Sequence, residues 1–167
     1  MNIVLCGMMG AGKTVVGKEL ADLSGRRLSD TDELISEKYG KISEIFEKYG
    51  EPYFRDLETE TAKFIADEDG LIVSTGGGFV MRKENAEYLK RNGTIFFLRA
   101  TKETLLKRLA FDTSRPLLKD GAEKKLSELL PLRTPIYEAV ADYIVDTDGK
   151  STEEVAKEIL ALAENKK

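Results

Sequence analysis

The 167-residue sequence has no histidine and no tryptophan, and its single cysteine is Cys6. Without histidine the chain can form neither a Ser-His-Asp nor a Cys-His nucleophile system, and it can hold no zinc through imidazole. One cysteine forms no disulfide within the chain and no thiolate metal cage, which suits a reducing compartment. A chain of this length forms one ordinary domain and buries roughly 70% of its unfolded surface, so its core needs no disulfide or structural metal for stability.

Long apolar runs and an excess of basic charge are also missing. The 26 Lys and Arg against 30 Asp and Glu give a formal net charge of −4, which argues against broad electrostatic binding to nucleic acid or anionic lipid. No apolar run approaches the ~20 residues that span a bilayer, and the start MNIVLC lacks the regions of a secretion signal. We therefore expect a soluble cytoplasmic protein with neither a nucleic-acid nor a membrane partner.

Short apolar runs alternate along the chain with helical stretches. Most of these runs are continuous, as in parallel strands covered on both faces. They lie at residues 3–6, 71–74, 94–98 and 143–145, with a weak one at 27–29. Helix signals lie between them: Thr101 is a candidate N-cap, Pro52 suits a first turn, and Ser151 with Glu154 forms a capping box. No linker or repeat divides the chain, so the sequence predicts a single α/β domain over residues 1–167.

Two segments depart from the helical pattern. Pro131 and Pro135 interrupt the apolar periodicity of residues 129–136, where we expect a helix to break or bend. Residues 111–122 (FDTSRPLLKDGA) collect polar, Gly and Pro residues around Arg115. This composition predicts a mobile loop flanked by helices.

Residues 7–14 read GMMGAGKT, a complete G-x-x-x-x-G-K-[ST] phosphate-binding pattern. The segment follows a predicted strand and leads straight into a helix, the setting in which loop amides and a helix N-terminus converge on one anion. The backbone of Gly10, Ala11 and Gly12 would then cradle phosphates. Lys13 would neutralise the β and γ phosphates of ATP, and Thr14 would ligate Mg²⁺. The alternative is a glycine-rich structural turn.

Two carboxylates follow the second predicted strand, at Asp30 and Asp32. Ligands of open α/β sheets bind at the carboxyl ends of the strands, which places both side chains near the phosphate loop. Asp32 would accept a proton from, or orient, a hydroxyl that attacks the γ-phosphate, and Asp30 would hold a water on the metal. The alternative is a routine helix N-cap.

The third predicted strand ends in Ser74 and Thr75 followed by Gly76, Gly77 and Gly78. Three glycines let a ligand reach the backbone, whose amides can donate to an anionic or hydroxyl-rich molecule; a structural turn is the alternative. The strand lacks the terminal Asp of many P-loop NTPases, which leaves Ser74, through a water, as a second candidate beside Asp30 for the magnesium.

Four arginines add anion-binding capacity to these motifs. A guanidinium group offers a planar fork for carboxylate or phosphate, although a single arginine is more often a solvated surface residue. The four are Arg55, Arg108, Arg115 and Arg133.

Together these residues resemble the shikimate kinase family. The resemblance covers nearly the whole chain, and its most specific part combines Phe54-Arg55, the three glycines and the R-x-P-x-Y of residues 133–137. The matching segments are residues 7–14, 30–32, 42–46, 50–55 with Glu58, 74–78, 115–118, 133–137 and 145–147.

The resemblance implies a three-layer P-loop kinase fold, like that of nucleoside monophosphate kinases, with a five-stranded parallel sheet between helices. It implies transfer of the γ-phosphate of ATP, with Mg²⁺, to the 3-hydroxyl of shikimate in the chorismate pathway to aromatic amino acids. We expect a monomer whose segment of about 31–62 binds substrate and whose segment of about 111–122 is a lid.

By the same resemblance, Asp32, Lys13 and Arg115 are the catalytic residues. Shikimate binding falls to Asp32, Arg55, Arg133 and the backbone of Gly76, Gly77 and Gly78. Arg115 closes over the nucleotide, and Arg108 and Lys150 lie near the adenine.

Two other functions remain open. A related small-molecule kinase, such as a gluconate kinase, would use the same phosphate loop for another polyol acid. A regulatory module that binds ATP without an acceptor would leave Arg55, Arg133 and the three glycines unexplained.

Overall fold

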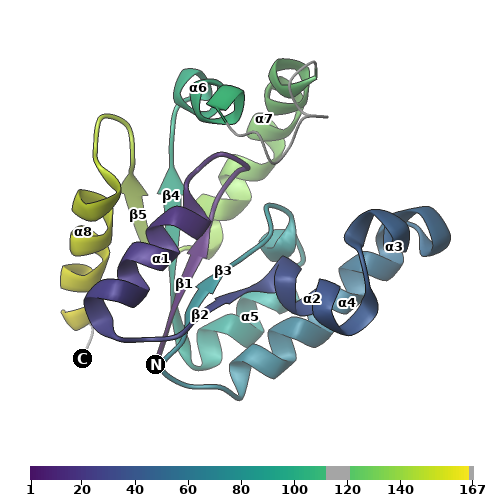
Figure 1. The fold of residues 1–167 in the computed structure, drawn as a ribbon, viewed down its shortest axis with the longest axis horizontal. Coiled ribbons are helices and arrows are strands. Elements are labelled where there is room, and N and C mark those ends of the chain that lie inside the picture. Colours follow the sequence, from purple (N-terminus) through teal and green to yellow (C-terminus); the bar gives the residue numbers. More distant parts are fainter. Residues whose placement is uncertain (112–120, 166–167) are drawn as a thin grey trace.

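The computed structural model describes residues 1–111 and 121–165 and contains one sheet of five parallel strands. Their order across the sheet is β2-β3-β1-β4-β5 (Figure 1). All five strands are confirmed to within one residue at each end, and their bounds are β1 Asn2–Cys6, β2 Leu28–Asp30, β3 Ile72–Ser74, β4 Gly93–Arg99 and β5 Tyr143–Asp146.

Helices cover both faces of this sheet, which confirms the three-layer α/β fold. Helices α1 (Lys13–Ser24) and α8 (Thr152–Glu164) pack together on one face, and α5 (Lys83–Arg91) and α7 (Ala122–Val140) lie on the other (Figure 1). The remaining helices are α2 Thr31–Tyr39, α3 Ile42–Tyr49, α4 Glu51–Ala66, the 3-10 helix η1 Phe79–Met81 and α6 Lys102–Phe111. In the part of the chain that the structure describes, none of these helices has the length and apolarity to span a membrane.

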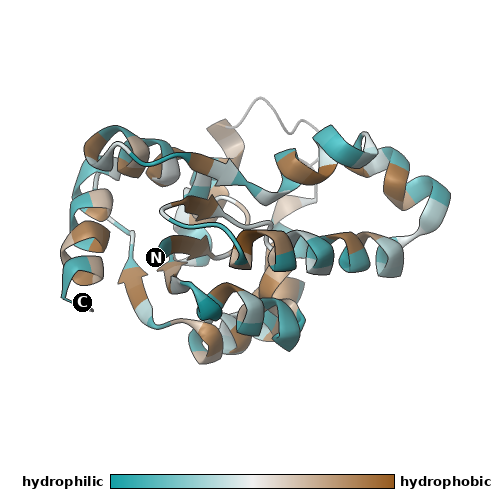
Figure 2. Cartoon of the chain, turned by 90° about the horizontal axis from the view of Figure 1, so that it is seen from below, coloured by the Kyte–Doolittle hydropathy of each residue, from teal (hydrophilic) through white to brown (hydrophobic). Residues whose placement is uncertain are grey.

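The central strands carry the main hydrophobic core, as their continuous apolar runs predict. Every residue of β1 and β3 is buried, and Figure 2 shows hydrophobic residues gathered on the strands and on the inner faces of the helices. Cys6 is fully inaccessible, and burial raises the pKa of its thiol to about 12. The thiol therefore stays protonated at neutral pH, where it is neither a nucleophile nor a metal ligand.

Helices α2, α3 and α4 enclose a second, smaller core beyond the β2 edge of the sheet. It consists of four buried side chains, Ile35, Ile45, Phe54 and Leu57. Burial of apolar surface stabilises the packing of these three helices against one another, by roughly 25 cal/mol per Å². They span most of the segment of residues 31–62.

The predicted helix boundaries at three positions are confirmed. Pro52 lies in the first turn of α4, and Ser151 and Glu154 form both hydrogen bonds of a capping box at α8. The Thr101 hydroxyl accepts from the Thr104 amide at 3.3 Å, ahead of α6. The first amides of a helix have no partner within the helix. The hydroxyls of Ser151 and Thr101 accept hydrogen bonds from such amides, and Pro52 has no amide hydrogen to satisfy.

The helix does not break at Pro131 and Pro135, because α7 runs from Ala122 to Val140 through both prolines. A bend at these positions, the other expectation, stays a prediction. Each proline removes one backbone donor and leaves the carbonyl four residues earlier without its helical partner. Both prolines are exposed, so water can reach that side of the helix. Leu126 and Tyr137 are buried on either side of the prolines and anchor the helix against the core.

Candidate active site

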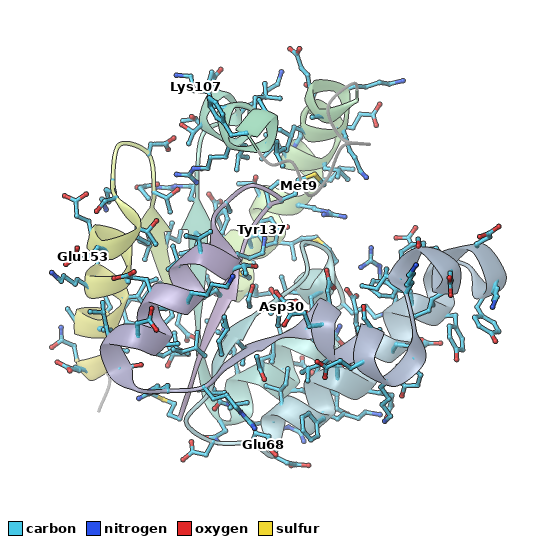
Figure 3. The ribbon with its side chains drawn as sticks, in the orientation of Figure 1. Met9, Asp30, Glu68, Lys107, Tyr137 and Glu153 are labelled. Atoms are coloured by element: carbon cyan, nitrogen blue, oxygen red, sulfur yellow. The ribbon has the colours of Figure 1, made fainter. Side chains whose placement is uncertain are left out.

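A cavity of about 370 Å³ opens at the carboxyl ends of β1, β2 and β3. It brings together the phosphate-binding loop, the two aspartates and the glycine segment that the sequence indicated separately. Figure 3 shows Met9 and Asp30 on the elements that border it, with Tyr137 nearby. Its lining is Met9, Gly10, Gly12, Lys13, Thr14, Val15, Asp30, Asp32, Ser74, Thr75, Gly76, Gly77, Arg108 and Phe111.

The loop of residues 7–14 has a backbone that only glycine adopts easily. Gly7 has φ 147° and Gly12 has φ 91°, and a Cβ on Gly7 would lie 2.7 Å from the Leu98 carbonyl oxygen. The Lys13 ammonium donates to the carbonyl oxygens of Gly7 at 2.7 Å and Met8 at 2.9 Å. Because α1 begins at Lys13, the loop amides, the helix N-terminus and one positive charge meet at the cavity.

Arg108 links this loop to the segment that follows β5. Its guanidinium donates to the Ala11 carbonyl at 3.1 Å and to the hydroxyl and carbonyl oxygens of Thr147 at 3.1 and 3.3 Å. Arg108 and Lys150 both line a neighbouring cavity of about 260 Å³, in which the Lys150 ammonium is paired with Glu158 at 2.6 Å. The two cavities share Gly12, Val15 and Arg108, so a nucleotide that fills both would cross Arg108.

Asp30 caps a helix and also faces the cavity. One carboxylate oxygen accepts from the amides of Asp32 at 3.0 Å and Glu33 at 3.3 Å, which caps α2. The other oxygen lies 3.4 Å from the Thr14 hydroxyl, at the cavity. Ser74 is buried and pairs with Asp30 across the β2 and β3 ladder.

These oxygen donors suit magnesium. Mg²⁺ prefers hard oxygen ligands and commonly takes one or two protein groups together with phosphates and waters. Thr14, Asp30 and Ser74 provide hydroxyl and carboxylate oxygens beside the phosphate loop. Within residues 1–111 and 121–165 no group of three or more His, Cys, Asp or Glu side chains gathers that could hold a metal alone.

The three glycines after β3 each lie under one of the predicted substrate-binding side chains. A Cβ on Gly76 would lie 2.8 Å from a carboxylate oxygen of Asp32, and one on Gly77 would lie 3.1 Å from a guanidinium nitrogen of Arg133. A Cβ on Gly78 would lie 2.5 Å from a guanidinium nitrogen of Arg55. Close approach of three side chains therefore explains why all three positions are glycine, which a simple turn does not.

Arg55 is held in place by two glutamates of its own helix. Its guanidinium donates to Glu58 at 2.9 Å and to Glu51 at 3.0 Å. Burial lowers the pKa of Arg55, but the two carboxylates outweigh this and raise it. Burial raises the pKa of Glu58, and the hydrogen bond from Arg55 opposes that rise. The ion pair with Glu58 fixes one edge of the Arg55 guanidinium. As pH falls toward the raised pKa of Glu58, its carboxylate becomes protonated and this ion pair weakens.

Sequence reasoning gave no role to three residues that complete the site. Glu58 stands in the resemblance only as a matching residue, although its spacing of three from Arg55 is a helical ion-pair signal. The buried Thr31 hydroxyl accepts from the Gly76 amide at 3.0 Å. The Tyr137 hydroxyl donates to the Gly77 carbonyl oxygen. Arg115, by contrast, lies outside the described residues, as does most of the segment of residues 111–122.

Replacing Gly78 with alanine tests the close approach of Arg55. The new methyl group would overlap the guanidinium, which is the end of a flexible side chain and moves more easily than backbone. We expect the Michaelis constant for the acceptor to rise about ten-fold, while the melting temperature changes little. Gly121→Ala is the matched control, because nothing lies within 4 Å of its Cβ position. An unchanged Michaelis constant in Gly78→Ala would remove Arg55 from the site.

A model of the family described as shikimate kinase matches residues 9–164. The chain belongs to the shikimate kinase family. A shikimate kinase from Thermodesulfovibrio yellowstonii is 47% identical over 161 residues, which cover 95% of this chain and 92% of that protein. Membership of the family confirms the resemblance drawn from the motifs.

Solved structures agree with this membership. The shikimate kinase of Acinetobacter baumannii in complex with shikimate has a TM-score of 0.90 and 41% identity, over 99% of this chain and 94% of that one. A gluconokinase from Sinorhizobium meliloti has a TM-score of 0.55 and 18% identity, over 98% of this chain and 94% of that one. The second likeness shows the fold alone.

Proposed function

We propose that this chain transfers the γ-phosphoryl group of ATP to the 3-hydroxyl of shikimate, giving shikimate 3-phosphate and ADP. The observation that supports this most directly is the convergence of one carboxylate and two guanidinium groups, from Asp32, Arg55 and Arg133, on the glycine segment beside the phosphate loop. A hydroxylated carboxylic acid matches that set of charges. Membership of the family and the likeness to a structure complexed with shikimate support the same acceptor.

On the nucleotide side, the amides of Gly10, Ala11 and Gly12 bind the phosphates and the Lys13 ammonium neutralises the β and γ groups. Arg108 and Lys150 border the adenine. Thr14 and Asp30, with Ser74, hold the Mg²⁺, directly or through water. When bound, Mg²⁺ offsets negative charge on the β and γ phosphate oxygens.

On the acceptor side, Asp32 accepts a hydrogen bond from the 3-hydroxyl and takes its proton as the oxygen bonds to the γ-phosphorus. The bond between the γ-phosphorus and the β,γ-bridging oxygen breaks, and that oxygen leaves as part of ADP. Arg55 and Arg133 bind the shikimate carboxylate and fix the direction of attack. The substrate-binding segment of residues 31–62 excludes water that would otherwise hydrolyse ATP.

A coupled assay that follows ADP, with mass detection of the phosphorylated product, tests the acceptor. With ATP and Mg²⁺ we expect shikimate to release ADP and to gain one phosphate, and we expect gluconate and nucleoside monophosphates to leave the rate at background. Chelation of the Mg²⁺ is expected to stop the transfer. Release of ADP with gluconate but not shikimate would favour a gluconate kinase, and ATP binding with no acceptor-dependent release would favour a regulatory module.

A further inference from the structure

Tyr137 lies next to the candidate site but has no part in the mechanism described so far. Its side chain is 1% exposed, in α7, and its ring stacks on Phe97 of β4 with centroids 5.0 Å apart. A phenylalanine would fill the same volume and make the same stack. The hydroxyl is therefore the part of this residue that core packing does not explain.

The hydroxyl lies beside two groups that the proposed function uses. It donates to the carbonyl oxygen of Gly77 and lies 3.8 Å from the Cβ position of that glycine. Arg133 stands one helical turn earlier in α7, and its guanidinium nitrogen lies 3.1 Å from the Cβ position of Gly77. Burial raises the pKa of Tyr137, so the hydroxyl stays protonated and keeps its role as donor.

We propose that Tyr137 is a positioning residue for the acceptor, whose hydroxyl fixes the Gly77 carbonyl beside the Arg133 guanidinium. The inference rests on the proposed function, because Arg133 and the glycine segment are its acceptor-binding parts. All peptide bonds in the described chain are trans, so a carbonyl fixed toward Tyr137 directs the Gly78 amide to the opposite side. One hydroxyl thus orients a backbone donor next to the guanidinium that binds the same acceptor.

A matched control exists in the neighbouring strand. Tyr143 stacks on Phe96, the residue before Phe97, with centroids 5.3 Å apart. Tyr143 is not among the residues that line either of the two cavities. Tyr143→Phe therefore removes a hydroxyl from the same kind of aromatic pair without touching the glycine segment.

The test compares Tyr137→Phe with Tyr143→Phe in steady-state kinetics, with ATP and shikimate each varied. We expect Tyr137→Phe to raise the Michaelis constant for shikimate about ten-fold and to leave that for ATP within about two-fold. Tyr143→Phe is expected to change neither. In an Arg133→Ala background, Tyr137→Phe is expected to add less than about two-fold, because the tyrosine acts partly through the arginine.

Two results would overturn the proposal. One is a Michaelis constant for shikimate that stays near the parent value in Tyr137→Phe, or that rises only in step with the Michaelis constant for ATP. The other comes from Phe97→Leu, which loosens the ring stack and keeps the hydroxyl. This variant is expected to melt at a lower temperature with a nearly parental shikimate constant, and an equal rise in that constant would assign the effect to packing.

All variants are assayed well below the lowest melting temperature in the set, so that unfolding does not enter the constants. The parent protein is measured first. If it shows no shikimate-dependent turnover, the proposed function fails; if it turns over shikimate and Tyr137→Phe is unchanged, only the role of Tyr137 fails.

Discussion

Replacing Lys13 with alanine is expected to lower the rate of phosphoryl transfer by about 10³-fold or more while the protein remains folded. The Lys13 ammonium lies over the phosphate-binding loop, 2.7 and 2.9 Å from two of its carbonyl oxygens. Charge that spreads over the γ-phosphate oxygens in the transition state is stabilised by a cation already fixed at that place. Truncation removes this charge, together with the donor to the carbonyl oxygens of Gly7 and Met8.

Stopped-flow or coupled measurement of ADP gives the rate, and thermal unfolding checks the fold. Lys18→Ala is the matched control, because Lys18 is exposed on the same helix α1. The control is expected to retain the parental rate. Activity of Lys13→Ala within a few-fold of the parent would reject the assignment of residues 7–14 as the phosphate cradle.

The central strands β1, β3 and β4 were predictable because each is a short, continuous apolar run, and continuity follows from burial on both faces. The edge strands β2 and β5 are less buried. The order of the strands was not predictable. Chain order places β2 directly after β1, whereas the sheet inserts β3 between them. That insertion puts Asp30, at the end of β2, directly beside Ser74, at the end of β3, a proximity that sequence spacing does not express.

Whether α7 breaks at its prolines could not be read from the sequence, for a related reason. Local rules weigh only the lost hydrogen bond at Pro131 and Pro135. Tertiary packing decides the outcome. The two prolines are exposed and take no part in the core, while Leu126 and Tyr137 are buried on either side of them. The helix consequently runs through both prolines and carries Arg133 between them.

In the candidate site, too, the motifs could be predicted from the sequence but the side chains that lie against them could not. The sequence predicted that residues 76–78 contact a ligand, but not which side chain lies on which glycine, because those side chains come from α2, α4 and α7. Asp30 was left between metal and N-cap roles, and its two oxygens in fact face different partners. Tyr137 stood out only as the last residue of the R-x-P-x-Y pattern, and the pattern gave its hydroxyl no role, since in sequence a buried aromatic residue looks like ordinary core.

Asp32→Asn is expected to lower the turnover number by about 10²- to 10⁴-fold if the carboxylate takes the proton of the attacking hydroxyl. Asparagine has nearly the same shape and keeps one oxygen acceptor, so a substrate hydroxyl can still be oriented by it. What the amide cannot do at neutral pH is accept the proton. In Asp32→Asn the Michaelis constant for shikimate is therefore expected to change much less than the turnover number.

The size of the loss separates two roles for this carboxylate. A decrease of only a few-fold would mean that Asp32 orients the hydroxyl and that the proton leaves by another route. Glu33→Gln is the matched control, since Glu33 is exposed on the same turn of α2 and its amide is capped by Asp30. A carboxylate oxygen of Asp32 lies 2.8 Å from the Cβ position of Gly76, at the glycine segment, and Glu33 does not line the cavity. A large loss in Asp32→Asn with a parental rate in Glu33→Gln would therefore reflect the chemistry of one oxygen rather than a displaced helix.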